Sequence, residues 1–451
     1  MKGNMTEGNP FGLIVRFSIP LLLGNLFQQT YNMVDAAIVG QTLGSDALAA
    51  VGSSSSVQFF VLGFVMGFAV GFSVPVSQRF GAKDYSGMRR FEFTGAVWAA
   101  IIAVIMTVAT CALCGTILHG LQVPEDIFSM SYQYLIIIFA GIPFTVLYNY
   151  LSGILRAIGD SKTPFLFLAT SAVLNIFLDF FCILVLHLGT AGAALATIVS
   201  QAISGILCLI LIKKKFDILH IGKEDRVINA DLSKKLLVMG IPMGLQFSIT
   251  AIGSMVMQSA NNGLGTLYVS GFTAGMKIKQ FMMCPFDAIA TAVSTFAAQN
   301  YGARKADRIK EGIIQGTALA VGYGIVAGIL MILFGKTMCL LFVSGSETKV
   351  IDCAYLYISR MAIFWWTLGF LNVERLSIQG LGHAGLAMFA GIIEMICRTV
   401  VSVGFVPMFG YNAITFADQT AWIGACLFVV PMCIIIVRKI AKQFAVEESL
   451  N

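Results

Sequence analysis

The sequence contains few charged residues and few histidines, and its cysteines follow no recognisable pairing. Of its 451 residues only 12% are charged and 57% are hydrophobic, whereas soluble domains are roughly a quarter charged and half apolar. The composition therefore excludes an ordinary soluble domain and predicts a membrane protein. The four histidines lack metal-ligand spacing and the ten cysteines suggest no disulfide framework, so we expect no metal site and no covalent crosslinks.

Motifs of several other protein classes are also missing. The chain contains no HExxH or GxSxG cluster, which an intramembrane enzyme would need. It has no selectivity-filter-like repeat of the kind that lines a channel. Its basic residues are not accompanied by the base-reading or aromatic side chains of a nucleic-acid-binding face. We therefore expect neither an enzyme nor a nucleic-acid partner, and no cofactor.

Long apolar stretches fill most of the chain. A helix needs about 20 apolar residues to cross the roughly 30 Å of hydrocarbon in a bilayer. The stretches that meet this length lie at about residues 12–40, 47–79, 91–118, 127–155, 164–186, 191–212, 236–262, 267–299, 312–343, 350–378, 384–408 and 416–437. The sequence thus predicts an all-α polytopic membrane protein with twelve transmembrane helices, six in each half.

The two halves of the sequence are related. The segment QRFGAK at 78–83 returns as QNYGAR at 299–304, and FSIP at 17–20 aligns with MGIP at 239–242. Because each half holds an even number of spans, the two six-helix repeats are parallel rather than inverted. We expect an N-terminal lobe at 1–213, a cytoplasmic linker at 214–235 and a C-terminal lobe at 236–451. A duplicated apolar chain of this kind is typical of secondary transporters.

The connections between spans differ in their charge. Every second connection is rich in Lys and Arg, as at 79–90, 156–162, 213–235, 304–310 and 438–442, and the alternate connections contain none around 41–46, 119–126, 261–266 and 408–419. Basic connections stay in the cytoplasm. We therefore expect a multi-pass protein of the plasma (inner) membrane, surrounded by the lipid bilayer, with both termini cytoplasmic.

The first span contains a polar stripe. Asn25, Gln28, Asn32 and Asp35 are spaced three, four and three residues apart, which puts them on one face of a helix. A carboxylate inside the membrane costs on the order of 3 kcal/mol on insertion scales. Asp35 should therefore face a cavity or partner side chains; the alternative is that it lies at the outer interface.

The fifth span contains a second acid, Asp179, one turn after Asn175. Both acids lie roughly 8 to 12 Å below the outer ends of their helices, at 1.5 Å per residue. Two carboxylates that share a poorly solvated pocket cannot both stay ionised at low cost, so the pair can take up a proton or Na⁺. Thr197 and Tyr31 could reach the same pocket; the alternatives are a backbone hydrogen bond for Thr197 and ordinary packing for Tyr31.

The second half carries charges of a different kind. In chain order these are Lys277, Lys279, Asp287, Arg360, Glu374, Arg375, Glu394 and Arg398. Glu394 and Arg398 are four residues apart, and we expect them to form a structural ion pair. Lys277 has no carboxylate on its own face within a turn, so it needs a partner on another helix, and Glu394 is the first candidate.

Taken together, these segments resemble the MATE (multidrug and toxic compound extrusion) family, and within it the DinF-like bacterial and archaeal branch. The resemblance covers nearly the whole chain. Its motifs are Ile19-Pro20, QQTYNMVDAAIVGQTLG at 28–44, the doubled QRFGAKD and QNYGARK, LRAIGDSKTP at 155–164 and LNIFLDF at 174–180.

The resemblance implies two six-helix bundles in a V-shaped arrangement and export of cationic amphipathic compounds in exchange for H⁺ or Na⁺. It implies that the ion-coupling residues, which could also hold Na⁺, are Asp35, Tyr31, Asn175, Asp179 and Thr197. The seventh span departs from the NorM-like pattern because it has Gln246 but no acid. We therefore expect coupling to depend mainly on the first lobe.

Methionine and polar side chains also suggest a substrate cavity, because flexible Met side chains adapt to varied apolar ligands. The residues that we expect to line it are Gln28, Asn32, Gln201, Gln246, Met257, Lys277, Met282, Glu374, Glu394 and Arg398. The function predicted is that of a multidrug efflux antiporter, and we expect a monomer. The alternative is a lipid-linked oligosaccharide flippase of the same superfamily, against which the twelve spans and the surroundings of Asp35 weigh.

Overall fold

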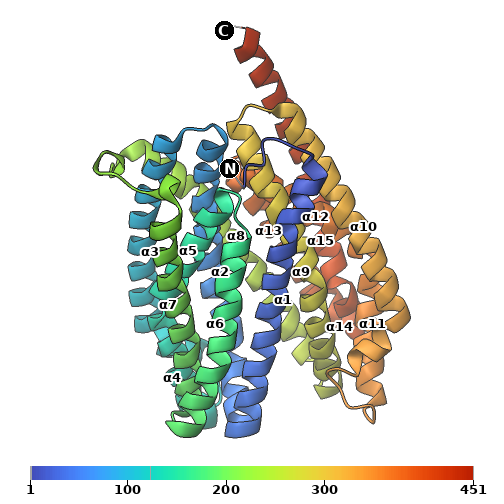
Figure 1. Ribbon diagram of the computed structural model, residues 1–451. Helices are drawn as coiled ribbons and strands as arrows, with labels where there is room; N and C mark the ends of the chain where they lie inside the picture. The colour runs from blue at the N-terminus through green and yellow to red at the C-terminus, as the bar shows by residue number, and fades with distance from the viewer. Residues whose placement is uncertain (1–2, 122, 450–451) are drawn as a thin grey trace. The chain divides into compact units, whose positions relative to one another are not determined.

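The computed structural model describes residues 3–121 and 123–449, apart from the side chain of Ser45, and nearly all of them are helical (Figure 1). The first half contains α1 (Pro10–Leu43), α2 (Ser45–Gly81), α3 (Tyr85–Gly120), α4 (Glu125–Ala140), α5 (Ile142–Ala157), α6 (Lys162–Phe180), the π-helical turn η1 (Phe181–Val185) and α7 (Gly189–Lys215). Two short 3₁₀ turns, η2 (Asp217–Leu219) and η3 (Lys223–Asp225), lead into the second half.

The second half repeats this order. It contains α8 (Ala230–Asn262), α9 (Thr266–Gly302), α10 (Ala306–Cys339), α11 (Thr348–Ile363), α12 (Trp365–Gly380), α13 (Ala384–Thr399), the π-helical turn η4 (Val400–Phe405), α14 (Val406–Phe409) and α15 (Tyr411–Ser449). A π-helical turn therefore follows both α6 and α13. Such turns are frequent next to functional sites.

The number of helices able to cross a membrane agrees with six spans in each half once two broken spans are recognised. Within the described residues, ten helices are long and apolar enough, and the pair of α4 and α5, bent by 46°, makes an eleventh candidate. The twelfth predicted span corresponds to α11 and α12. This pair is more polar, because it carries charges at 349, 352, 360, 374 and 375.

Two of the predicted spans, 127–155 and 350–378, are each divided into two helices. The first breaks at Gly141, and Pro143, near the start of α5, cannot donate the backbone hydrogen bond that would continue α4. The second breaks at Phe364, between α11 and α12, where the Thr367 hydroxyl bonds the Phe364 carbonyl at 2.7 Å. Both halves thus break the corresponding span.

Backbone geometry confirms the duplication. Lys83 and Arg304, which end the doubled motif, both have left-handed conformations, with φ of 58° and 57°. In each copy the next residue closes the helix with a backbone bond, from Asp84 to Arg79 at 3.0 Å and from Lys305 to Asn300 at 2.9 Å. This pattern is a typical helix C-terminal cap. Equivalent sequence segments therefore fold in the same way.

The chain forms two compact units that exchange their leading segments. The first unit contains 1–4 and 23–244, and the second contains 5–22 and 245–451. The start of α1 thus belongs to the second unit and the start of α8 to the first, and the two changeover points are 222 residues apart. Each unit has its own apolar core, built around Phe68, Phe139 and Ile154 in the first and around Phe286, Trp365 and Trp422 in the second. The lobe limits predicted from the sequence stay a prediction.

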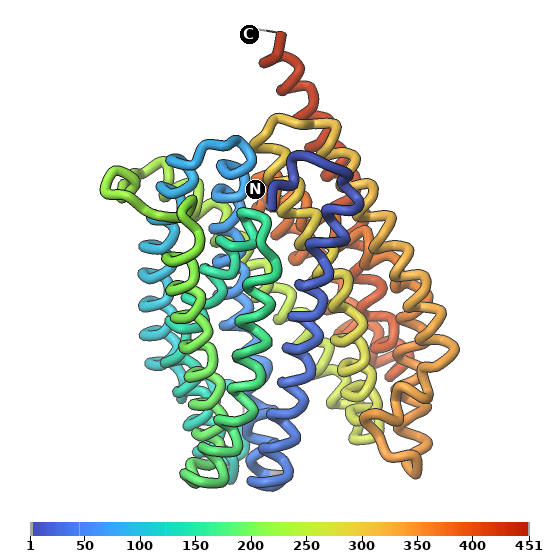
Figure 2. Tube along the Cα trace, viewed as in Figure 1, coloured from blue at the N-terminus to red at the C-terminus, as the bar shows by residue number. Residues whose placement is uncertain are grey.

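Side chains of α3, α9 and α10 hold these leading segments. In the second unit, Asn300 and Arg308 both donate to the Met5 carbonyl at 3.1 Å, and Gln299 accepts from the Met5 amide at 2.9 Å. Figure 2 shows this dark-blue segment beside the yellow connection of α9 and α10. In the first unit Thr94 donates to the carbonyl of Val227, 222 residues after Met5, at 2.8 Å.

Candidate functional site

The two acids predicted to form the coupling pair come together in the first unit. Asp35 is carried by α1 and Asp179 by α6, and the two carboxyl groups are close enough to interact electrostatically. Asp179 is completely buried, and Asp35 is half-buried. The structure thus brings the two predicted acids together. Their common depth in the membrane stays a prediction, and the alternative of an interfacial Asp35 stays open.

Each acid has one oxygen that is free to receive a ligand. Oδ1 of Asp35 and Oδ1 of Asp179 are buried and accept no hydrogen bond from any described residue. No cation from the protein neutralises the pair, because neither acid takes part in a salt bridge with a described residue. Two adjacent carboxyl groups without a protein counter-charge favour the uptake of one proton or one small cation.

Asn175 links the pair to α7. It is 1% exposed, and with its amide oriented to satisfy both polar groups it donates to Asp179 Oδ2 and accepts from the Thr197 amide, each at 3.3 Å. The Thr197 hydroxyl donates to the Ala193 carbonyl at 3.1 Å, so the alternative of a backbone bond for this hydroxyl is correct. Thr197 thus lies at the site and contributes its backbone amide.

Two tyrosines complete the surroundings of the pair. Tyr31 interacts electrostatically with Asp35. Tyr134 of α4, which is 4% exposed, interacts electrostatically with both acids. Sequence reasoning missed Tyr134, because one tyrosine in an apolar helix resembles ordinary packing. The site draws on α1, α4, α6 and α7.

The second unit lacks an equivalent pair. At an offset of 222 residues, Asp35 corresponds to Met257 and Asp179 to Val401, and both apolar side chains are buried. The duplication that preserved the fold therefore did not preserve the acids.

The second unit instead contains a buried network of ion pairs. Lys279 of α9 donates to Asp418 of α15 at 2.5 Å, and the Tyr357 hydroxyl donates to the same oxygen at 2.6 Å. Arg398 Nε bonds the other Asp418 oxygen at 3.0 Å. Asp418 is completely buried, and it is held by two cations and a hydroxyl.

The network continues toward α12. Arg398 contacts Glu394 at 3.3 Å and Arg375 contacts Glu394 at 2.8 Å. The predicted pair of Glu394 and Arg398 is thus confirmed, although it is one part of a longer chain. Three cations, Lys279, Arg375 and Arg398, face two acids, so the network has one excess positive charge.

The prediction that Lys277 is the buried lysine was wrong. Lys277 is exposed, whereas Lys279 is 7% exposed and its partner is Asp418 rather than Glu394. Lys279 shares a face of α9 with the buried Gly271, Phe272 and Gly275, and this spacing is a signal that could have identified it. Asp418 was missed because we assigned 408–419 to a connection, whereas α15 begins at Tyr411.

The residues predicted to line a substrate cavity have different exposures. Asn32 and Lys277 are exposed, and the half-buried ones are Gln28, Gln201 and Met282. The buried ones are Gln246, Met257, Glu374, Glu394 and Arg398. Gln201 accepts from the Thr145 hydroxyl at 2.6 Å, Gln246 from Gln379, and Glu374 from the Thr317 hydroxyl at 3.1 Å.

Among the described residues, no group of three or more His, Cys, Asp or Glu side chains is arranged to hold a metal ion. The pair of Asp35 and Asp179 offers two buried carboxylate oxygens that accept no hydrogen bond.

Comparison with known proteins agrees with this architecture. The MatE family model matches residues 20–181 and again 242–403. A probable multidrug resistance protein of Bacillus subtilis (strain 168), YpnP, is 31% identical over 426 residues, which cover 93% of this chain and 91% of the relative. The multidrug export protein MepA of Staphylococcus aureus (strain MSSA476) is 23% identical over 382 residues, 84% of each chain.

A solved structure has the same fold. It is described as an outward-facing conformation of a multidrug resistance MATE family transporter of the MOP superfamily. Its TM-score is 0.92 at 22% identity, and the match covers 98% of this chain and 99% of that one. The predicted fold class, an all-α polytopic membrane protein with a MATE fold, is thereby confirmed. With the family model matched in both halves, the chain belongs to the MatE family.

Proposed function

We propose that the protein is a secondary active multidrug efflux antiporter, which exports cationic amphipathic compounds in exchange for H⁺ or Na⁺. Membership of the MatE family supports transport, and the names of the similar Bacillus and Staphylococcus proteins support multidrug export. The motif at 28–44 and the LNIFLDF segment favour the DinF-like branch.

The observation that carries this proposal is the contact of Asp35 with the fully buried Asp179. One proton or Na⁺ on the pair removes the repulsion between two close carboxylates, and so favours the packing of α1 against α6. A cationic substrate that competes for the same negative charge favours the alternative packing. Coupling requires only this difference in affinity between two conformations.

Asn175, Thr197 and Tyr31 act as positioning residues in this proposal. Asn175 orients Asp179 through its amide, and it is itself fixed by the Thr197 backbone. Tyr31 lies between Gln28 and Asp35 on α1. Because these groups are neutral, they can hold the acids in place without supplying a competing positive charge.

The second unit takes a different part. Asp418 and Glu394 are already neutralised by Lys279, Arg398 and Arg375. A transported cation would have to displace these buried cations, at a large energetic cost. We therefore assign coupling to the first unit. The exposed or half-buried Asn32, Gln28 and Gln201 are the residues that we propose for the substrate path.

The charge pattern supports an orientation. The connections at 79–90, 156–162, 213–235 and 304–310 contain the Lys and Arg residues, and we propose that they and both termini are cytoplasmic. We further propose a monomer in the cell membrane, because each unit builds its own core from this chain alone.

The test is reconstitution into proteoliposomes loaded with a fluorescent cationic dye, with a pH gradient and a Na⁺ gradient imposed separately. Dye efflux that depends on one gradient is the expected result, and it identifies the coupling ion. Efflux that responds to neither gradient, from correctly folded protein, contradicts antiport.

A further inference from the structure

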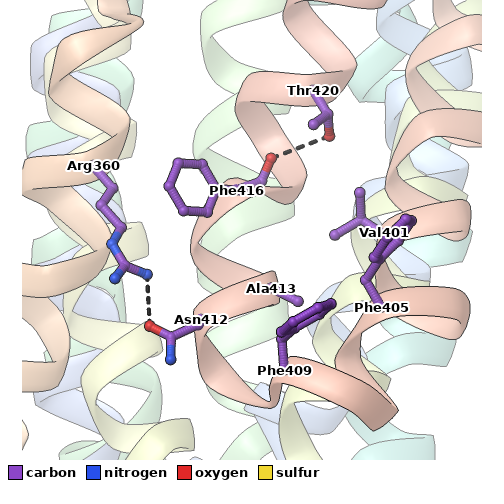
Figure 3. A pocket seen from close by; sticks show the side chains of 8 residues that line it. All are labelled: Arg360, Val401, Phe405, Phe409, Asn412, Ala413, Phe416 and Thr420. Carbon is purple, nitrogen blue, oxygen red and sulfur yellow. Dashed lines mark hydrogen bonds between the residues drawn. The ribbon is translucent and has the colours of Figure 1, made fainter.

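A pocket lies in the second unit. It has a volume of about 370 Å³, within the size range of small-molecule sites. Figure 3 shows that one face of α15 forms its floor, with Arg360 of α11 on one side and Val401 and Phe405 of η4 on the other. Phe409, at the end of α14, lies below Ala413 in the same view.

The pocket combines one cation with an apolar wall. Arg360 Nη1 donates to Asn412 Oδ1 and to the Thr415 hydroxyl, both at 2.8 Å. Its guanidinium lies 5.1 Å from the centre of the Phe416 ring. Phe405 and Phe409 are 47% and 57% exposed, so the apolar wall is open to a ligand.

The charge of Arg360 is not neutralised by the protein. No described carboxylate lies within salt-bridge distance of it, and its hydrogen-bond partners are neutral. By contrast, the neighbouring Lys336 of α10 pairs with Asp352 at 2.7 Å. A guanidinium with five donors and only neutral partners retains full affinity for a phosphate.

The position of the pocket along the membrane fits a lipid headgroup. Arg360 lies roughly 18 Å along α11 from its first residue, at 1.5 Å per residue. Its side chain nevertheless extends back to Asn412, the second residue of α15. Long basic side chains extend in this way toward the membrane surface. In the orientation proposed above, this surface is the outer one.

We propose that this pocket binds one anionic phospholipid, whose phosphate contacts Arg360 and Asn412 and whose acyl chain lies over Phe405, Phe409 and Phe416. The positive charge disfavours the cationic compounds assigned to the transport pathway, which separates this site from the substrate site. The aromatic wall matches an acyl chain, and the π-helical backbone of η4 positions Val401 and Phe405 toward it.

The experiment is native mass spectrometry of the full-length protein in detergent, with phosphatidylglycerol or phosphatidylcholine of identical acyl chains added. The wild type should retain phosphatidylglycerol in preference. Both lipids carry a phosphate, and the positive charge of Arg360 favours the one without the cationic choline group. Arg360→Gln removes this charge and should reduce the preference about tenfold, and Arg360→Lys should retain part of it. The matched control Lys336→Gln should leave the preference unchanged.

Two further arms separate lipid binding from other roles. Phe409→Ala should lower the retention of both lipids equally, and millimolar inorganic phosphate should not displace phosphatidylglycerol. The proposal is overturned if folded Arg360→Gln keeps the wild-type preference while its thermal stability falls, since Arg360 would then only join α11 to α15. Displacement by inorganic phosphate alone would also overturn it, because the site would then be one for free anions.

Discussion

Lys279 and Asp418 form a buried ion pair of 2.5 Å between α9 and α15. The pair occupies the half of the molecule in which the equivalents of the coupling acids are Met257 and Val401. The second unit has thus retained buried acids, and it has paired Asp418 and Glu394 with cations. The first unit leaves carboxylate oxygens of Asp35 and Asp179 without a partner, whereas the second uses two of its carboxylates to hold helices together.

The first prediction concerns this ion pair. Asp418→Asn leaves Lys279 and Arg398 without their shared acid, and the loss of one partner from a buried pair costs about 3–5 kcal/mol. The variant should therefore unfold at a clearly lower temperature in detergent, measured by scanning fluorimetry. The control Lys336→Met, at an exposed pair, should leave the unfolding temperature nearly unchanged.

The double variant Lys279→Met with Asp418→Leu tests the same point. It removes one charge of each sign, so the network keeps its single excess positive charge. It should recover much of the stability lost by Asp418→Asn, because well-packed apolar residues can replace a buried pair. If the double variant is less stable than Asp418→Asn, the network does more than neutralise its own charges.

The second prediction concerns Asp225 in the connection between the two halves. Asp225 is 1% exposed. Burial by itself raises its pKa, but hydrogen bonds from Arg89, the Gly222 amide and Ser86 outweigh burial, and the net pKa lies below its ordinary value. A depressed folded-state pKa stabilises the fold above the unfolded pKa of about 3.9, and this stabilisation is lost as the pH falls through the folded value.

The lowered pKa of Asp225 can be tested by the dependence of the unfolding temperature on pH. Asp225→Asn should lower the unfolding temperature at pH 7, and the difference from the wild type should shrink as the pH falls below about 4. Asp217→Asn, at an exposed position of the same connection, is the matched control and should have little effect. A difference that stays constant down to pH 3 contradicts the role of the Asp225 carboxylate.

The third prediction concerns the leading segment held by side chains of α9 and α10. Arg308→Ala removes donors to the carbonyls of Met5 and Gly8, and Asn300→Ala removes another from Met5. Arg308→Ala should raise amide hydrogen exchange across residues 5–9 by roughly tenfold, because hydrogen bonds to charged groups contribute about 1.5–3 kcal/mol. Asn300→Ala should raise it less, because a neutral hydrogen bond contributes about 1 kcal/mol. The exposed Lys310→Ala on the same helix is the control. Unchanged exchange in both variants means that other contacts hold the segment.

The fourth prediction concerns orientation. In a cysteine-depleted background, Ser344→Cys should react with an impermeant thiol reagent added to intact cells, whereas Lys214→Cys should react only after permeabilisation. Both positions are exposed, so burial does not limit the reaction. The reverse pattern contradicts the orientation inferred from the basic connections.

Sequence reasoning predicted that Asp35 and Asp179 come together because the signal of each acid is local. Asn32 and Asp35 lie one turn apart on α1, and Asn175 and Asp179 lie one turn apart on α6, so helical periodicity alone showed two polar faces inside the membrane. Because a carboxylate is costly to bury in a membrane, we expected the two acids to lie in one pocket, and this places α1 beside α6. Both steps follow from the sequence.

The features that the sequence did not reveal depend on contacts between distant segments. Lys277 and Lys279 are two residues apart, and only packing against α11 and α15 decides which of them is buried. Asp418 pairs with a residue 139 positions away. The exchange of leading segments likewise depends on bonds such as that of Asn300 with Met5, separated by 295 residues. No local pattern encodes such partners.

The last prediction tests the coupling pair itself. Asp35→Asn and Asp179→Asn should each lower gradient-driven dye efflux from proteoliposomes to nearly the rate of empty liposomes, while leaving a folded protein that still binds dye. Because the two acids act as one site, the double variant should be little worse than either single variant. Asp352→Asn, an exposed acid at the start of α11, is the matched control and should export at the wild-type rate. Wild-type efflux by folded Asp35→Asn protein, or losses that simply add in the double variant, would show that the two carboxylates do not share the coupling ion.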